Sequence, residues 1–316
     1  MKLHTSVNLE PQAHGLIDYN SQLLMLGSCF AENMGYFLNY FKFKTQLNPF
    51  GILFNPIAIE NLITRAINKE YYKAEDVYHS NEQWFCFEAH SKLNSVSKNE
   101  LVDDLNNALD LTYQHVLSAT HICITLGTAW VYRLIEQDKI VANCHKQPQK
   151  LFLKELLSVD AIEHSLNGIN ALIKDVNPKV SVIYTVSPVR HVKDGLVENN
   201  QSKAHLISAL HAVVDQKQHI HYFPAYELMM DELRDYRFYE DDLIHPNCIA
   251  TSYIWEKFQE VWLSEDVSEY MKQIDQIQKG LQHRPFNENS ESHQKFLKDI
   301  ENKIVQIRKQ LAHISF

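Results

Sequence analysis

The feature that most constrains the fold is the alternation of short apolar runs with long helical patterns. Each run has the length of a buried strand and ends at a turn residue or a polar group. Because parallel strands need long crossovers, this alternation predicts a parallel sheet covered by helices. We expect an α/β fold, a three-layer α/β/α sandwich around about five strands. Four strands are predicted over residues 23–26, 121–126, 180–186 and 219–223.

Helix start signals lie between these runs. Asn55 and Pro56 form an N-cap followed by proline, and Ser97 with Glu100 forms a capping box. Apolar residues at helical spacing predict further helices over 162–173 and 206–213, and another directly after Asn247. Residues 71–95 fit none of these periods, so we interpret them as an insertion or a lid.

The chain changes character after residue 265. Apolar residues step by three and four over 267–281 and again over 297–311, and turn-forming residues separate the two series. This pattern predicts an antiparallel helical hairpin over 266–316, following an α/β domain over 1–265. The hairpin is predicted to pack on that domain or on a second subunit, which would make the protein a homodimer.

Composition excludes several classes of function. The chain has 316 residues and a formal net charge of −9, and it contains no basic stripe of the kind that binds nucleic acid. It shows no export signal and no apolar run of membrane-spanning length, so we expect a soluble, cytoplasmic protein. Five widely spaced cysteines without a CxxC pair indicate reduced thiols. Nucleotide-binding glycine motifs and zinc-binding spacings are missing, and no metal or organic cofactor is predicted.

A serine at the junction of a buried strand and a helix is the sharpest local signal. The strand ends at Gly27, and the chain enters a helix through Ser28. A side chain at this corner lies at the carboxyl edge of the sheet, where open α/β folds place their ligands, beside the free N–H groups of a helix. Ser28 is therefore a candidate nucleophile, and the alternative is that it only caps the helix.

Asp242 and His245 form a second signal, in the loop before the last helix of the α/β domain. They lie three positions apart, so the carboxylate can hold the Nδ1 proton of the imidazole and leave Nε2 to face a nucleophile. With Ser28 they make a workable catalytic triad. The alternative is a surface Asp–His pair that precedes a helix N-cap.

These features together resemble the SGNH (GDSL-like) hydrolase superfamily. The string Gly-Ser-Cys-Phe-Ala at 27–31 looks like the namesake motif of the GSCFA family within it. Similar blocks occur at 48–56, 126–132, 143–146 and 187–191. The resemblance covers roughly residues 1–265 and leaves the helical tail outside. It implies an SGNH-like sandwich with a flavodoxin-like strand order.

The resemblance also implies site residues. Ser28 matches the family nucleophile, Asp242 its orienting acid and His245 its general base. Gly51 matches the block that offers a backbone N–H to the oxyanion, and Gly127 matches the glycine of the third block. We therefore expect backbone N–H groups at Ser28 and Gly51 to hold the oxyanion.

One position departs from the superfamily pattern. An Asn usually follows the third-block glycine by two residues and donates its side-chain amide to the oxyanion, whereas this chain has Ala129. Losing one such donor costs on the order of 10² to 10³ in rate, so another group must replace it or activity is weak. Thr128, Asn48 and Asn143 are the candidates, and the sequence does not choose among them.

Three further residues have a functional and a structural interpretation. His145 is either a hydrogen-bond donor to substrate or part of a polar loop. Arg190 ends a predicted strand at the same edge as Ser28, so it is a candidate anchor for a carboxylate or phosphate. Cys29 follows Ser28 at the helix start, but as the first helical residue it is expected to pack inertly rather than react.

The sequence therefore predicts a serine esterase that cleaves a small acyl ester. By analogy with the superfamily, the leading substrate is an O-acetylated carbohydrate. Two alternatives remain. The same triad could transfer the acyl group to an alcohol or amine, or the site could be degenerate and the protein a binding or scaffold protein.

Overall fold

The centre of the molecule is a five-stranded parallel sheet. The computed structural model describes residues 5–316, and the strands follow the spatial order β2-β1-β5-β9-β10. Their bounds are β1 Gln22–Gly27, β2 Lys44–Leu47, β5 His121–Leu126, β9 Ser181–Val186 and β10 Ile220–Tyr222. This sheet confirms the predicted fold class and all four predicted strands. β2 was not predicted, because this edge strand is only partly buried and contains no apolar run.

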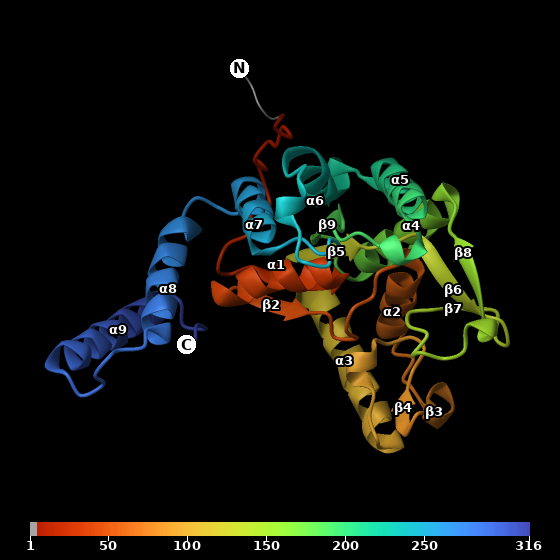
Figure 1. Cartoon of the computed structure of the whole chain (residues 1–316), viewed down its shortest axis with the longest axis horizontal. Helices are drawn as coiled ribbons and strands as arrows, with labels where there is room; N and C mark the ends of the chain where they lie inside the picture. The colour runs from red at the N-terminus through yellow and green to blue at the C-terminus, as the bar shows by residue number, and fades with distance from the viewer. Residues whose placement is uncertain (1–4) are drawn as a thin grey trace.

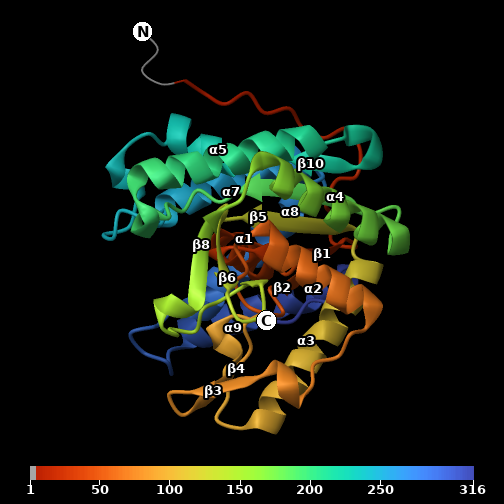
Figure 2. The ribbon, with the colours of Figure 1, turned by 90° about the vertical axis from the view of Figure 1, so that its right-hand side faces the viewer.

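Alternate residues of the central strands enter two separate apolar cores. In β1, Leu24 and Leu26 face one core, whereas Leu23 and Met25 face the other. The first core contains α2 (Pro56–Asn68), α3 (Lys98–Ser118), α4 (Val159–Val176) and α5 (Leu196–Val213), and the second contains α1 (Cys29–Tyr40) and α7 (Cys248–Trp262). The sheet is therefore the middle of three layers, as Figures 1 and 2 show.

The predicted helix starts are largely confirmed. Asn55 Oδ1 accepts the backbone N–H of Ala58 at 2.8 Å, and Ser97 Oγ accepts that of Glu100 at 3.3 Å. The reciprocal half of the predicted capping box is replaced, because the Glu100 carboxylate accepts a hydrogen bond from Ser95 Oγ. Side-chain caps therefore begin both α2 and α3.

The described residues also form two small antiparallel sheets outside the central sheet. Residues 69–97, called the insertion below, contain the hairpin of β3 (Tyr78–Ser80) and β4 (Gln83–Phe85), which lies beside α3 in Figure 2. A second sheet has the order β7-β6-β8. Its strands are β6 Trp130–Leu134, β7 Lys139–Val141 and β8 Phe152–Leu156. These short strands of mixed polarity were not predicted.

Short helical turns occupy several connections. The loop after β10 contains α6 (Ala225–Glu227) and a π-helical turn, Leu228–Glu232. Six turns are 3₁₀-helical: Ala74–Asp76, Ser91–Leu93, Gln149–Leu151, Val192–Asp194, Gln216–Gln218 and Tyr236–Phe238. Two of them, in the loops after β9 and before α7, contribute to the candidate site described below.

The C-terminal residues form the expected helical hairpin. It consists of α8 (Val267–Gln282) and α9 (Glu291–Gln310) and lies at the end of the molecule remote from β3 and β4 (Figure 1). At Gly280 the helices approach so closely that a Cβ would lie 2.4 Å from Ile300 Cδ1. Tyr40 at the end of α1 donates a hydrogen bond to Asp275 of α8 at 3.0 Å. The hairpin therefore packs on the α/β part of its own chain, and dimerisation through it stays a prediction.

In residues 5–316 no helix is both long enough and apolar enough to cross a bilayer.

Candidate active site

Ser28 lies at the corner between β1 and α1, as predicted. The backbone turns at Gly27, where φ is +126° and a Cβ would lie 2.1 Å from the carbonyl oxygen of Thr125. Only glycine fits this close approach of β1 and β5. Ser28 is the N-cap of α1, and its Oγ accepts the backbone N–H of Phe30 at 3.3 Å. Ser28 therefore caps α1, and its role as nucleophile stays a prediction.

Asp242 and His245 form the predicted acid–imidazole pair. Asp242 Oδ2 lies 2.7 Å from His245 Nδ1, and Oδ1 accepts the backbone N–H groups of Ile244 and His245 at 2.8 and 3.0 Å. Hydrogen bonds from the His245 backbone and side chain, followed by that from Ile244, lower the pKa of Asp242 to about 2. Asp242 therefore stays ionised near neutral pH and can orient the imidazole and stabilise its charged form.

The second contact of the predicted triad, between Ser28 and His245, is not formed in this structure. No hydrogen bond joins Ser28 Oγ to His245 Nε2 within the described residues, where Phe30 is the donor to Ser28 Oγ. Ser28 is also fully buried, with 0% of its surface exposed, whereas the His245 side chain is 46% exposed. A catalytic contact therefore requires His245 and Ser28 to approach each other, as catalytic groups often do when substrate binds.

Neither backbone N–H group predicted to hold the oxyanion is free. The Ser28 N–H donates to the Thr125 carbonyl at 3.0 Å, which extends the pairing of β1 with β5. The Gly51 N–H donates to the Asn48 carbonyl at 2.8 Å and closes a turn. Both donors therefore bind backbone carbonyls that shape the corner, and their role in holding the oxyanion stays a prediction.

Asn48 carries an unused donor at this corner. Its Oδ1 accepts the Gly27 N–H at 2.9 Å, which fixes the amide beside the residue that precedes Ser28. Its Nδ2 is buried and has no hydrogen-bond partner in the described residues. A buried amide is costly to leave unpaired, so an unpaired one in a native fold demands an explanation. Among the three candidate replacements for the family Asn, Asn48 is the one with a free, buried donor.

The side-chain oxygens of the other two candidates, Thr128 and Asn143, already form hydrogen bonds. Thr128 Oγ1 shares a hydrogen bond with Ser202 Oγ at 3.0 Å and accepts the Trp130 N–H, also at 3.0 Å. Asn143 Oδ1 accepts the His145 N–H at 2.8 Å, in a turn that contacts the insertion. Both side chains therefore stabilise loop structure, and the bond of Asn143 uses its acceptor Oδ1 rather than its Nδ2 donor.

Gly127 lies at the end of β5, in a position that requires glycine. A Cβ there would lie 2.7 Å from Phe54 Cβ and 3.1 Å from His191 Nε2. Its N–H donates to the Phe54 carbonyl at 2.7 Å, so Gly127 shapes the rim without offering an oxyanion donor. Phe54, Thr128, Trp130 and His191 line a cavity of about 190 Å³ here.

Arg190 connects the loop after β9 to the catalytic loop, a name used here for residues 234–247. Its backbone N–H donates to the Ile244 carbonyl at 3.1 Å, and its Nη1 donates to the Leu243 carbonyl at 3.3 Å. Its guanidinium lies over Tyr239, 5.4 Å from the ring centroid, and lines a cavity of about 440 Å³ with Tyr226. Arg190 thus contacts the loop that carries His245, and its role as an anion anchor stays a prediction.

His145 holds the insertion rather than facing Ser28. It is buried, and its Nε2 lies 2.8 Å from the Cys86 carbonyl and 3.0 Å from the Ala89 carbonyl. Burial lowers the pKa of His145, so the neutral ring donates from Nε2 to these carbonyls. These contacts favour the structural interpretation of His145, because its donor binds two backbone carbonyls, and a role as substrate donor stays a prediction.

Cys29 agrees with the inert interpretation. It packs against the core that contains α1 and α7. Burial, with a smaller contribution from the negative charge of Glu32, raises the pKa of its thiol. A protonated thiol is a poor nucleophile, so Ser28 remains the better candidate at this corner.

Lys203 and His191 are site residues that were not predicted. Lys203 is only 1% exposed, and its Nζ donates to the carbonyls of Gly127 and Ser187 at 2.7 Å each. Burial, followed by the charges of Lys203 and His245, lowers the pKa of His191 to about 3, so its ring is neutral. Lys203 shares the buried helix face of Leu206, and this spacing was the available signal.

In the described part of the chain, residues 5–316, no group of three or more His, Cys, Asp or Glu side chains gathers as a metal site would require.

Two family models match the chain. The model described as "GSCFA family" matches residues 22–258, and the model described as "GSCFA domain protein, C-terminal domain" matches residues 274–316. The second match corrects the expectation that the helical tail lies outside the resemblance. No curated protein matches the chain.

Proposed function

The chain belongs to the GSCFA family, and we propose that it is a serine hydrolase of the SGNH type that cleaves a small acyl ester. One observation supports this proposal above the others. Asp242 is ionised and bonded to His245 Nδ1 at 2.7 Å, on a loop held beside the carboxyl edge of the sheet by Arg190. This is the arrangement that prepares an imidazole to act as a general base.

In the proposed reaction His245 Nε2 takes the hydroxyl proton of Ser28. Ser28 Oγ then bonds to the acyl carbon, and the carbonyl oxygen becomes a tetrahedral oxyanion. When the ester C–O bond breaks, the His245 proton goes to the leaving alcohol. Water, deprotonated by His245, then attacks the acyl-serine and releases the carboxylic acid and free Ser28.

Asn48 is the proposed side-chain donor to the oxyanion. Its Nδ2 is the free donor at the corner, and the Gly27 N–H fixes the orientation of its amide. A preorganised donor of this kind stabilises the charge that develops in the transition state more than it stabilises the neutral ester. Asn48 would thus replace the superfamily Asn that is missing at Ala129.

The sizes of two cavities favour a substrate with a small acyl group and a larger alcohol. The cavity of about 190 Å³ beside Gly127 is lined mainly by aromatic and aliphatic side chains, among them Phe54 and Trp130, and it fits a group of acetyl size. The cavity of about 440 Å³ at Arg190 has the size and mixed polarity of a small-molecule site. By analogy with the superfamily, an O-acetylated carbohydrate is the proposed substrate class.

Movement is part of the proposal, because Ser28 is buried. The Ser28 hydroxyl must rotate away from the Phe30 N–H, and the catalytic loop must bring His245 to it. The side chain of His245 is exposed and Leu243 has a strained positive φ of +55°, so we expect this loop to be the partner that moves.

The test is turnover of p-nitrophenyl acetate, with labelling by diisopropyl fluorophosphate located by mass spectrometry. Ser28→Ala and His245→Ala should each lower kcat by about 10³-fold or more. Asn48→Asp keeps the acceptor for the Gly27 N–H but removes the donor, so it should lower kcat by about 10²- to 10³-fold. Cys29→Ala is the matched control and should keep wild-type activity.

Each other result points to a different function. Equal rates in wild type and the Ser28 and His245 variants, without labelling of Ser28, would leave a binding or scaffold protein. Loss of activity in Cys29→Ala alone would identify Cys29 as the nucleophile. Acyl transfer to an added alcohol or amine in preference to water would identify an acyltransferase that uses the same triad.

A further inference from the structure

Lys203 places a buried positive charge beneath the carboxyl edge of the sheet. It projects from α5, is only 1% exposed, and donates from Nζ to the carbonyls of Gly127 and Ser187 at 2.7 Å each. These two residues are the first after the neighbouring strands β5 and β9. The ammonium therefore joins the two strand ends from which the loops around the site begin.

The partners of this ammonium are all neutral in residues 5–316. No carboxylate forms an ion pair with Lys203, and its remaining close neighbour is the ring of Tyr226, with its centroid 5.6 Å from Nζ. A buried charge without a counter-ion costs free energy, and an apolar side chain would fill the same helix position without that cost. A lysine at this position therefore calls for a functional reason.

We propose that Lys203 is a positioning residue of the Ser28 site, whose ammonium holds the ends of β5 and β9 together and keeps a positive charge behind the nucleophile. This inference rests on the proposed hydrolase function and deepens it. The positive charge of Lys203 is felt at the corner between β1 and α1, because it interacts electrostatically with the thiol of Cys29, the residue next to Ser28. A positive charge there favours the oxyanion over the neutral ester.

The charge of Lys203 is set to change near neutral pH. Burial lowers the pKa of Lys203 to about 7 from its ordinary value of 10.5, while the two carbonyls favour the charged form. The titratable groups that face it are the thiol of Cys29, the hydroxyl of Tyr226 and the imidazole of His191. None of them carries a negative charge at neutral pH, since burial raises the pKa of both Cys29 and Tyr226.

The first experiment is the pH dependence of kcat for p-nitrophenyl acetate. Wild type should lose activity as the pH rises through about 7 to 8, because Lys203 loses its proton in this range. Lys203→Arg keeps its charge and should retain activity to pH 9, with kcat at pH 6.5 within about fivefold of wild type. Lys203→Met should lower kcat about 10- to 100-fold, change KM less than threefold and remove the alkaline decline.

Lys174→Met is the matched control. Lys174 Nζ donates to the carbonyl of Val180, which directly precedes β9 at the opposite edge of the sheet, and burial lowers its pKa as well. This variant should keep the wild-type kcat and pH profile. If Lys203→Met fails to fold, the pH profile of wild-type kcat is the test. A wild-type kcat that does not decline between pH 6.5 and 8.5 would overturn the proposal.

A second readout separates this inference from the proposed function. The unfolded chain binds a proton at Lys203 between pH 7 and 10.5 that the folded protein does not, so the free energy of unfolding should rise with pH across this window. Lys203→Met should lose this rise. If Lys203→Met turns over the ester at the wild-type rate, the role of Lys203 is overturned, and the hydrolase proposal is not. Wild type without turnover or Ser28 labelling would overturn the hydrolase proposal and this inference together.

Discussion

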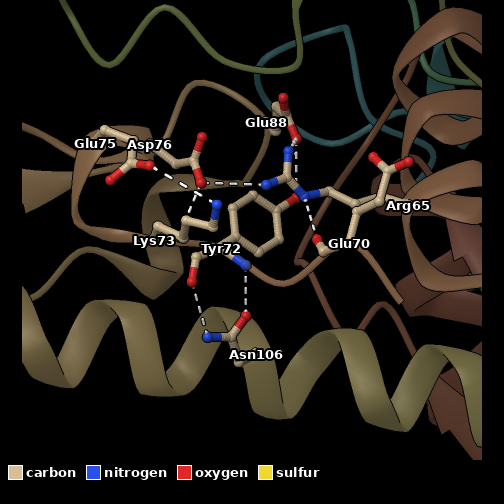
Figure 3. Close-up of polar contacts among 8 residues, drawn as sticks. All are labelled: Arg65, Glu70, Tyr72, Lys73, Glu75, Asp76, Glu88 and Asn106. Atoms are coloured by element: carbon tan, nitrogen blue, oxygen red, sulfur yellow. Dashed lines mark hydrogen bonds and ion pairs between the residues drawn. The ribbon is translucent and has the colours of Figure 1, made fainter. Parts of the chain in front are cut away.

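The insertion between α2 and α3 and the catalytic loop before α7 are both irregular segments near the candidate site, yet different contacts hold them. The insertion is tied to the rest of the molecule by charged and aromatic side chains. Arg65 of α2 donates from Nε to the Glu70 carbonyl at 2.7 Å and from its two Nη atoms to Glu88 and Asp76, both at 3.2 Å (Figure 3). A single side chain therefore joins three points of the insertion.

Other contacts brace the insertion around Tyr72. The guanidinium of Arg65 lies 3.8 Å from the centroid of the Tyr72 ring, and the Tyr72 hydroxyl donates to Glu88 at 3.0 Å. Asn106 of α3 accepts the Tyr72 N–H at 2.7 Å and donates to its carbonyl at 3.0 Å, as Figure 3 shows. Together with His145, these contacts fix the base of the insertion to three neighbouring elements.

The catalytic loop is held mainly by hydrogen bonds within itself. The Glu240 N–H donates to the His245 carbonyl at 2.8 Å, and the Leu243 N–H donates to the Glu240 carbonyl at 2.9 Å. Its bonds to Arg190 reach the neighbouring loop, and most of residues 234–245 are exposed. Segments with few buried contacts open at low cost. We therefore expect the catalytic loop, rather than the insertion first interpreted as a lid, to be the segment that moves His245 toward Ser28.

The largest effect is expected from Asp242→Asn in the catalytic loop. The amide cannot stabilise the charged imidazole and favours the wrong tautomer, so kcat should fall by about 10³- to 10⁴-fold while the fold stays intact. The readout is ester turnover beside a thermal melt. Asp241→Asn, at the exposed neighbouring position, is the control and should change kcat less than twofold. If Asp242→Asn and Asp241→Asn are equally active, this loop has no catalytic role.

Arg65→Met should have the largest effect on stability. It leaves Glu88 and Asp76 without their cation, and the Arg65 side chain is only 17% exposed, so the free energy of unfolding should fall by about 2–4 kcal/mol. This value allows for solvent screening at the two carboxylates, which are about one-third exposed. The readout is urea denaturation, with kcat of the folded protein unchanged.

Arg237→Met, in the catalytic loop, is the control for Arg65→Met. Its ion pair with Asp235 is exposed at both side chains, so its loss should cost less than about 0.5 kcal/mol. If the two variants lose equal stability, the insertion is no better braced than the catalytic loop, and the comparison is wrong.

The fold and the contact between Asp242 and His245 were predictable because their signals are local. A wholly buried strand such as β5 is visible as an apolar run, and Asp242 can hold His245 because three positions separate them in one loop. The turn that the Gly51 N–H closes on Asn48 was not predictable, since a family block does not show which carbonyl accepts its N–H. Lys203 was missed because its partners are carbonyls of two other elements.

The smallest effect tests the turn Ser91–Leu93 near the end of the insertion, where Lys92 Nζ contacts Glu32 Oε1 at 2.6 Å. Glu32 lies in the first turn of α1, so this contact ties the insertion to the helix that Ser28 begins. Lys92 is 58% exposed, and an exposed pair of this kind contributes about 0–1 kcal/mol. Because the Arg65 contacts hold the insertion without it, Lys92→Met should lower the free energy of unfolding by less than about 1 kcal/mol and change kcat/KM less than threefold.

Lys73→Met is the control for Lys92→Met, since Lys73 pairs with Glu75 at 4.0 Å inside the insertion and far from α1 in sequence. Both variants should behave alike if the insertion is a fixed wall. A tenfold rise of kcat/KM in Lys92→Met alone would mean that its contact with α1 restrains an opening that admits substrate. The insertion would then be the moving segment, the braces around Arg65 would act as its hinge, and the catalytic loop would be the fixed partner to which Ser28 becomes accessible.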